Sequence, residues 1–237
     1  YNYVWSPIGG SSDIANNLPA NNYTVLVTDA NGCTQTTTVA VTQPTQMTAS
    51  AVNTDVSCFG LNDASASVTA GGGITPYTYL WSPVGGTAAI ANNIPANPYT
   101  VLVTDQNGCT LTATLVVTEP PPLTSGTTPP VNVTCYNLYD GSVSVNAAGG
   151  TTPYTYAWSP QGGNGPSANN LYAGNYTVLI TDAHGCTSES TAIITQPPLL
   201  IAAIVDHTDN LCHGDQLGTA VVDVQGGIPN YEIGRAH

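Results

Sequence analysis

One eleven-residue stretch occurs three times in the chain, and its recurrence limits the folds that this sequence can adopt. Its copies are Tyr23–Cys33, Tyr99–Cys109 and Tyr176–Cys186. In each copy a Tyr, a Val and then a Val or Ile alternate with Thr and Leu, the period-two pattern of a strand with one buried face. An Asp-x-x-Gly turn follows, in which Gly tolerates positive φ and Asp can accept hydrogen bonds from nearby backbone N–H groups. The stretch therefore predicts a β-hairpin, and its recurrence predicts repeated β modules.

Other residues recur with the same long period. The three Trp residues are 76 and 77 residues apart, and three of the six Cys residues are 77 and 77 apart. This period is that of a small domain, because solenoid repeats are roughly 20 to 50 residues long. We predict a partial repeat at 1–44, complete repeats at 45–120 and 121–197, and a partial repeat at 198–237, whose last four residues fit no repeat.

The two partial repeats are complementary. Tyr1 aligns with Tyr77, and Tyr231 aligns with Tyr154, so the chain begins and ends at a predicted third strand. Two arrangements are open. Either the chain is cut from a much longer array, or the tail of one subunit completes the head of the next by strand donation.

Each complete repeat is predicted to be a small sandwich. About seven short strands with turns every 8 to 12 residues are typical of an immunoglobulin-like fold. The Trp falls on the third strand, where such sandwiches bury one, and the Tyr that opens each hairpin lies where a tyrosine corner is expected. The fold class is therefore all-β, with tandem immunoglobulin-like (PKD/HYR-like) domains of about 77 residues in a linear rod. The residues expected to hold each module together are Trp5, Trp81, Trp158, Tyr23, Tyr99 and Tyr176.

Charge and composition exclude several functions. One Lys or Arg against 14 Asp and Glu gives a net charge of −13, whereas nucleic acids and anionic membranes need clustered cations. No apolar run approaches the roughly 20 residues of a membrane span. Four scattered His and no recurring acid–base pair leave no constellation for catalysis. We expect no enzyme activity, no cofactor, no nucleic-acid partner and no membrane insertion in this segment.

The six cysteines recur at fixed places, which is typical of an oxidising compartment. Three pairings are open. Bridges within a repeat would join Cys58 to Cys109 and Cys135 to Cys186, leaving Cys33 and Cys212 with partners outside the chain or in a neighbouring repeat. Sequential bridges would join Cys33–Cys58, Cys109–Cys135 and Cys186–Cys212. A third arrangement joins one domain to the next, as Cys58–Cys186.

The hairpin turns also offer a weak calcium site. Asp29, Asp105 and Asp182 supply carboxylate oxygens in an acidic chain, which are ligands that Ca²⁺ accepts. The alternative, which we favour, is a turn whose Asp bonds the backbone. A second and weaker set of calcium candidates lies in the first-cysteine loops, at Asp63, Asp140 and Asp215. Four aromatic residues could stack on sugars, although we favour ordinary packing for them. They are Phe59, Tyr136, Tyr139 and Tyr172.

The repeated motifs together resemble a known family. The sequence from Cys58 to Val68, the stretch Gly72–Ser82, the hairpin Tyr99–Thr110 and Thr118-Glu-Pro are similar to the SprB repeat of Bacteroidota surface adhesins. The resemblance covers nearly the whole chain. It implies an exported cell-surface protein, carried by type IX secretion and associated with attachment and gliding.

These observations lead to one expected function and one alternative. The first is a structural repeat region of an extracellular adhesin or surface filament, a disulfide-stiffened stalk whose partners are other copies of the repeat or neighbouring subunits. The alternative is a carbohydrate-binding or calcium-dependent recognition module appended to a secreted enzyme, with surface glycans as partners.

Overall fold

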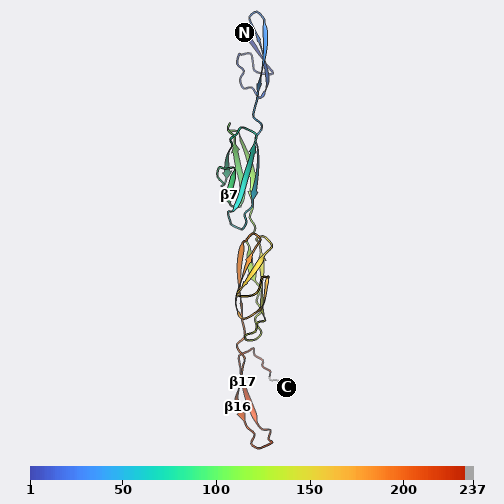
Figure 1. Cartoon of the computed structure of the whole chain (residues 1–237), viewed down its shortest axis with the longest axis vertical. Helices are drawn as coiled ribbons and strands as arrows, with labels where there is room; N and C mark the ends of the chain where they lie inside the picture. Colours follow the sequence, from blue (N-terminus) through green and yellow to red (C-terminus); the bar gives the residue numbers. More distant parts are fainter. Residues whose placement is uncertain (233–237) are drawn as a thin grey trace. The chain divides into compact units, whose positions relative to one another are not determined.

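A computed structural model of the chain describes residues 1–232, which form seventeen β-strands and no helix (Figure 1). The chain is therefore all-β in the part that the structure describes, as the alternating pattern predicted. The four residues that fit no repeat, 234–237, lie outside the described residues. With no helix among residues 1–232, no helical span that could cross a membrane is found there.

The repeat at 45–120 contains two three-stranded sheets. One sheet has the order β4-β5-β7 and the other β6-β8-β9. This is the order A-B-E and C-F-G of an immunoglobulin-like sandwich. The strand bounds are β4 Thr48–Thr54, β5 Ala64–Gly71, β6 Thr78–Ser82, β7 Ile90–Ile94, β8 Asn97–Thr104 and β9 Thr110–Val117.

The repeat at 121–197 has the same topology. Its sheets have the orders β10-β11-β13 and β12-β14-β15. Its core gathers Trp158, Leu171, Tyr176, Val178 and Ile180, all buried. The strand bounds are β10 Thr124–Thr127, β11 Gly141–Ala148, β12 Thr155–Ser159, β13 Ser167–Leu171, β14 Gly174–Thr181 and β15 Thr187–Ile194.

Each complete repeat has six strands where about seven were predicted. In the first of them, the stretch between β6 and β7 forms bends and no edge strand. Gly85 explains this path, because a Cβ added there would lie 2.9 Å from Trp81 Cβ. The backbone passes directly over the buried indole and is held by it, since Trp81 Nε1 donates to the carbonyl of Ala88 at 2.9 Å.

The two partial repeats hold complementary strands. Residues 1–44 form one sheet in the order β1-β2-β3, which matches the C-F-G sheet of a complete repeat. Residues 198–232 form the hairpin β16-β17, which matches strands A and B. The bounds are β1 Asn2–Ser6, β2 Asn21–Thr28, β3 Thr34–Val41, β16 Ile201–Thr208 and β17 Thr219–Gln225.

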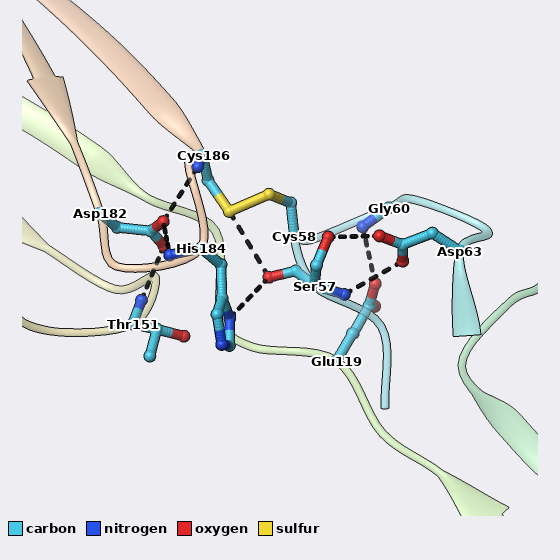
Figure 2. The surroundings of a disulfide bond; sticks show 9 residues. All are labelled: Ser57, Cys58, Gly60, Asp63, Glu119, Thr151, Asp182, His184 and Cys186. Atoms are coloured by element: carbon cyan, nitrogen blue, oxygen red, sulfur yellow. Dashed lines mark hydrogen bonds between the residues drawn. A yellow bond between two sulfur atoms is a disulfide. The ribbon is translucent and has the colours of Figure 1, made fainter. Parts of the chain in front are cut away.

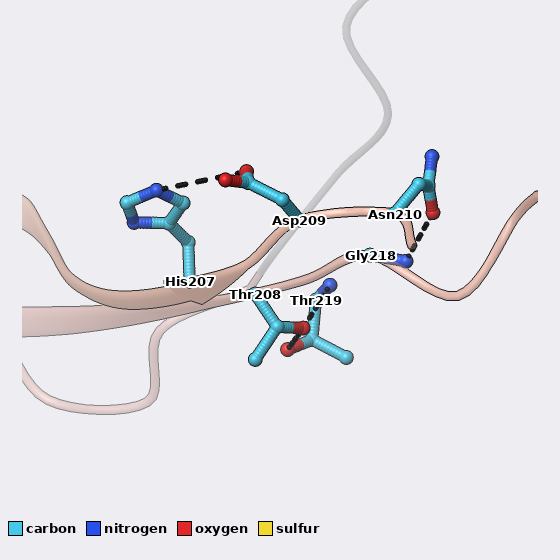
Figure 3. A network of polar contacts seen from close by, with 6 residues as sticks. All are labelled: His207, Thr208, Asp209, Asn210, Gly218 and Thr219. Carbon is cyan, nitrogen blue, oxygen red and sulfur yellow. Dashed lines mark hydrogen bonds and ion pairs between the residues drawn. The ribbon is translucent and has the colours of Figure 1, made fainter. Parts of the chain in front are cut away.

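Side chains close the loop end of the last hairpin (Figure 3). The hydroxyls of Thr208 and Thr219 share a hydrogen bond of 2.7 Å across the two strands. Asn210 Oδ1 accepts the N–H of Gly218 at 2.7 Å, and His207 Nε2 lies 3.9 Å from Asp209 Oδ1. These contacts link the two strands and the loop residues beside them, although β16 is exposed along its whole length.

The Trp and Tyr residues that the sequence analysis selected are buried to different degrees. Trp81 and Trp158 are 4% and 8% exposed, whereas Trp5 in the partial repeat is only half-buried. Tyr23, Tyr99 and Tyr176 are all buried. In the corner contact, Tyr23 Oη donates to Pro19 O at 2.8 Å and Tyr176 Oη donates to Tyr172 O at 3.1 Å.

Internal contacts divide the chain into two compact units. The first comprises Tyr1–Thr54, Ser65–Ile94 and Pro98–Val116. The second comprises Asp55–Ala64, Pro95–Asn97 and the chain from Val117. The loop that carries Cys58 therefore belongs, by its contacts, with the repeat that follows it and not with the body of its own repeat.

Candidate functional site

A disulfide bond between Cys58 and Cys186 joins the two complete repeats (Figure 2). The two cysteines are 128 residues apart in sequence, and their Cα atoms are 5.7 Å apart. Cys58 lies in the first-cysteine loop of the repeat 45–120, and Cys186 ends the hairpin turn of the repeat 121–197. We call this assembly, within the second compact unit, the closed joint.

The loop of Cys58 is held in shape by Asp63. Its Oδ1 accepts the N–H of Ser57 at 3.0 Å, and its Oδ2 accepts the hydroxyl of Ser57. The N–H of Leu61 donates to the carbonyl of Cys58 at 3.1 Å. The hydroxyl and then the amide of Ser57 lower the pKa of Asp63 below its usual value, so the carboxylate stays ionised in neutral solution.

The same loop is tied to the strand exit that leads to the next repeat. The N–H of Gly60 donates to Glu119 Oε2 at 2.6 Å, and the N–H of Thr118 donates to Asp55 Oδ1 at 2.8 Å. A backbone bond from Val56 N to Thr118 O at 3.0 Å completes the contact. A charge-assisted bond to a backbone amide is stronger than a neutral one, so Glu119 fixes the loop against the linker.

The hairpin side is organised by Asp182. Its Oδ1 accepts the N–H groups of His184 and Cys186 at 2.9 Å each, and its Oδ2 accepts the N–H of Thr151 at 2.8 Å. Burial alone would raise the pKa of Asp182, but the three N–H donors outweigh it and lower that pKa. Gly150, at φ +55°, leaves room for the carboxylate, since a Cβ there would lie 2.6 Å from Asp182 Oδ2.

Two further contacts cross the closed joint. His184 Nδ1 lies 3.2 Å from the carbonyl oxygen of Ser57, and Cys186 Sγ lies 3.5 Å from the same oxygen. A groove of about 380 Å³ runs beside the bond. Its lining combines loop, linker and hairpin, namely Cys58, Phe59, Leu61, Pro122, Leu123, Gly185, Cys186 and Thr187.

The structure corrects the pairing that the cysteine spacing made simplest. Neither bridge within a repeat is formed, because Cys109 and Cys135 are both free and exposed. Cys33 and Cys212 are also free and exposed, which rules out the sequential pairing in this structure. The first cysteine and the hairpin turn stand at opposite ends of one sandwich, so the cysteine at one end meets the turn of the next repeat.

All three Asp residues of the hairpin turns act as hydrogen-bond acceptors for the backbone. Asp29 Oδ1 accepts the N–H groups of Asn31 and Cys33 at 2.8 Å each. Asp105 repeats this pattern with Asn107 at 2.9 Å and Cys109 at 2.8 Å, and its Oδ2 accepts Ile74 N at 3.0 Å.

The bond from Ile74, the largest single influence, lowers the pKa of Asp105. This is the geometry of the side-chain-bonded turn, the alternative to a calcium site. Among residues 1–232, no three His, Cys, Asp or Glu side chains are grouped as a metal would require.

The sequence analysis did not identify several residues that hold the joint together. Glu119 has a counterpart in Gln196, whose Oε1 accepts Asn137 N at 2.9 Å. Asp55 has a counterpart in Asn132, whose Oδ1 accepts Thr195 N at 2.9 Å. Both pairs recur at a spacing of 77 residues, which was the available signal. Their role could not be assigned because each carries a polar side chain of a type common in loops.

One pair of the aromatic residues considered for sugar stacking lies together on the surface. The rings of Tyr139 and Tyr172 have centroids 5.7 Å apart and are tilted by 45°. They are 57% and 46% exposed. Phe59 and Tyr136 are exposed as well, but each lies in a first-cysteine loop and lines a groove there.

A comparison with protein families confirms the resemblance seen in the motifs. Residues 50–86 and 127–165 match the family model of the SprB repeat, one segment in each complete repeat. Each complete repeat therefore contains a segment similar to the SprB repeat. No curated protein sequence matches it.

Similar solved structures include three proteins of diverse kinds. A structure on Dscam isoform specificity is 12% identical with a TM-score of 0.32, and the match covers 82% of this chain and 64% of that one. A C-terminal fragment of intimin, in complex with the intimin-binding domain of its translocated receptor, is 14% identical, with coverages of 76% and 59% and a TM-score of 0.32.

The third is SGBP-B of the Bacteroides ovatus mixed-linkage glucan utilization locus, in complex with a heptasaccharide. It is 15% identical, with coverages of 91% and 65% and a TM-score of 0.18. The chain spans less than two thirds of each of these solved chains. Because the TM-scores of these matches are low, the immunoglobulin-like fold is assigned from the strand order of this chain.

Proposed function

We propose that this chain is a structural repeat region of an extracellular, adhesin-type surface protein, in which consecutive SprB repeats are stapled to one another. The observation that carries the proposal is the disulfide between Cys58 and Cys186, which joins the loop of one repeat to the hairpin turn of the next. A bond in this place resists separation of neighbouring modules, which is what a stalk under tension requires. Disulfides also persist in extracellular compartments.

The surroundings of the bond support a mechanical role. On each side the cysteine sits in a frame of hydrogen bonds to an Asp carboxylate, Asp63 on the loop and Asp182 on the hairpin. Tension entering through either sulfur therefore reaches backbone that several bonds hold in place. Nothing in this frame needs a ligand to complete it.

The wider setting belongs to the same proposal. The SprB-repeat match supports a location at the cell surface of a Bacteroidota bacterium, with export by type IX secretion and a role in attachment or gliding. Within this setting the repeats act as a spacer between the cell and the element that binds. Enzyme activity and a cofactor form no part of this role.

The test is mechanical. When a single chain is pulled by its two ends, the segment between Cys58 and Cys186 should not extend until a reductant is added. A chain that extends to the same length with and without reductant would contradict the proposal.

A second candidate function is contact with surface glycans through Tyr139 and Tyr172. The exposed, tilted ring pair favours it, because aromatic faces stack on sugars. A glycan array probed with the full chain and with the Tyr139→Ala, Tyr172→Ala variant tests it. Saturable binding that this variant loses, while Tyr136→Ala keeps it, would support the glycan role; absence of binding by the full chain would exclude it for the glycans on the array.

A further inference from the structure

The closed joint contains a second connection that does not pass through sulfur. It begins in the loop of Cys58, where the N–H of Gly60 donates to Glu119 Oε2 at 2.6 Å (Figure 2). Two residues further along the linker, the carbonyl of Pro121 accepts the N–H of Gly150 at 2.8 Å. The loop is thereby tied, through the linker, to the part of the following repeat that lies against the hairpin turn.

The same connection continues into the turn of Cys186. The N–H of Thr151 donates to Asp182 Oδ2 at 2.8 Å, and the N–H of Ala183 donates to the carbonyl of Thr151 at 2.8 Å. Asp182 Oδ1 in turn accepts the N–H of Cys186 at 2.9 Å. A series of hydrogen bonds and short lengths of backbone therefore runs from the loop of one cysteine to the turn of the other.

The loop half of the joint keeps its shape where its cysteine is free. Cys135 lies in the equivalent loop of the next repeat and forms no disulfide in this structure. The N–H of Asn137 nevertheless donates to Gln196 Oε1 at 2.9 Å, and the N–H of Thr134 donates to Asp140 Oδ1 at 3.1 Å. These bonds repeat the ones that tie the loop of the closed joint to its linker and to its own Asp. Neither bond therefore requires a disulfide.

The hairpin half likewise keeps its shape without a disulfide. Cys109 is free, yet its N–H donates to Asp105 Oδ1 at 2.8 Å. Asp105 Oδ2 also accepts the N–H of Ile74 at 3.0 Å. Asp182 makes the same two kinds of contact in the turn of Cys186. Both halves of the joint are thus formed by hydrogen bonds that do not depend on sulfur.

We infer that the closed joint is a redox switch whose two halves stay docked when the disulfide is reduced, with Glu119 as the residue that positions the loop. Two molecules of glutathione reduce the bond. They supply two electrons and two protons, which give the thiols of Cys58 and Cys186, and they leave as oxidised glutathione. The reverse exchange restores the bond, and because the halves remain docked, the same two cysteines pair again.

Reduction then changes the strength of the joint and not its arrangement. The oxidised joint bears load, whereas the reduced joint yields to tension and closes again when tension and reductant are removed. The inference rests on the disulfide that carries the proposed function, but the two can fail separately. Pulling tests whether the closed bond bears load, and the experiments below test whether the opened joint stays docked.

The glutathione equilibrium of the bond provides the first test. Competing thiols are removed from the full chain by changing its four exposed cysteines to Ser, namely Cys33, Cys109, Cys135 and Cys212. This reference variant is equilibrated in mixtures of reduced and oxidised glutathione, and alkylation measures the reduced fraction, which gives the effective concentration of Cys58 and Cys186. It should lie well above the roughly millimolar value of two sites joined only by a flexible linker. A value of about 1 mM would mean that the halves separate on reduction, and would overturn the inference.

Amide hydrogen exchange in the reduced reference variant provides the second test. The N–H of Val56 donates to the carbonyl of Thr118 at 3.0 Å, a contact between loop and linker that involves no sulfur. Its protection should persist after reduction. Loss of protection at Val56 on reduction, while the amides of β8 stay protected, would show that the loop undocks and would refute the inference.

Substitutions of Glu119 test its positioning role in the same reduced variant. Glu119→Ala removes the acceptor of the Gly60 N–H and should lower the protection of Val56 about tenfold, because a hydrogen bond to a charged group is lost from the docked state. Glu119→Gln should keep that protection, since Gln196 Oε1 makes the same contact in the next repeat.

Gln196→Ala is the matched control. It removes the equivalent acceptor beside Cys135, so it should lower the protection of Val133, whose N–H donates to the carbonyl of Thr195 at 3.1 Å. Protection at Val56 should not change. Equal protection of Val56 in Glu119→Ala and the reference variant, or an equal loss at Val56 in Gln196→Ala, would contradict the role assigned to Glu119.

Discussion

Breaking the bond between Cys58 and Cys186 should lengthen a stretched chain by a large amount. When the chain is pulled from its ends, tension passes through the S–S bond, and the residues between the two cysteines bear none of it. The bond bypasses 128 residues. Because an extended chain spans about 3.3–3.6 Å per residue, opening the bond should release about 420–460 Å of contour length.

Single-molecule force spectroscopy measures this difference directly. The chain is held through peptide tags fused to its two ends, first in oxidising buffer and then with a reductant. Oxidised chains should show only the unfolding of segments outside the bypassed stretch, and reduced chains should show the added length. The Cα atoms of the two cysteines are 5.7 Å apart, so the folded joint itself contributes little to the measured difference.

Two variants separate the bond from other effects of reduction. Cys58→Ser, Cys186→Ser should give the long contour length without reductant. The matched control Cys109→Ser, Cys135→Ser removes two exposed cysteines but leaves the bond, so it should behave as the wild type does. The mechanical reasoning would be wrong if the oxidised wild type already reached the full length, or if the control variant did.

Three further predictions concern stability. Trp158→Ala should cost about 3–5 kcal/mol of unfolding free energy, because the indole is 8% exposed, and Trp5→Ala should cost clearly less, which denaturant titration of the full chain can compare. Since the pKa of Asp182 is lowered in the folded state, its contribution to stability should be present above the unfolded pKa of about 3.9 and disappear as pH falls through the lower folded pKa. Melting curves against pH should therefore fall less steeply for Asp182→Asn than for the wild type; equal slopes would contradict the assignment. Adding calcium or a chelator should leave the melting temperature of the chain unchanged, because Asp29 and Asp105 are engaged by backbone N–H groups, and a shift of several degrees would restore the calcium site.

Local patterns in the sequence were sufficient for the elements of the fold. Alternation from Tyr176 to Thr181 predicted β14, and Asp182 with Gly185 predicted its turn, because both depend on residues close together in the chain. The period of 76 to 77 residues likewise predicted that the modules repeat. The number of strands was harder to predict from the sequence, since the bends beside Trp81 depend on the packing of Gly85 against the indole.

The partner of Cys58 could be decided only in three dimensions. Cys109 and Cys186 end turns of the same Asp-x-x-Gly type, and the N–H of each donates to the Asp of its turn, so the turn motif by itself does not distinguish them. A disulfide needs two Cα atoms within about 7 Å, and that distance is set by which end of a sandwich each loop occupies. The sequence alone therefore determined the module and its hairpin, because both follow from local, repeated patterns. The tertiary structure decided which cysteines form the disulfide, because that bond joins residues 128 positions apart.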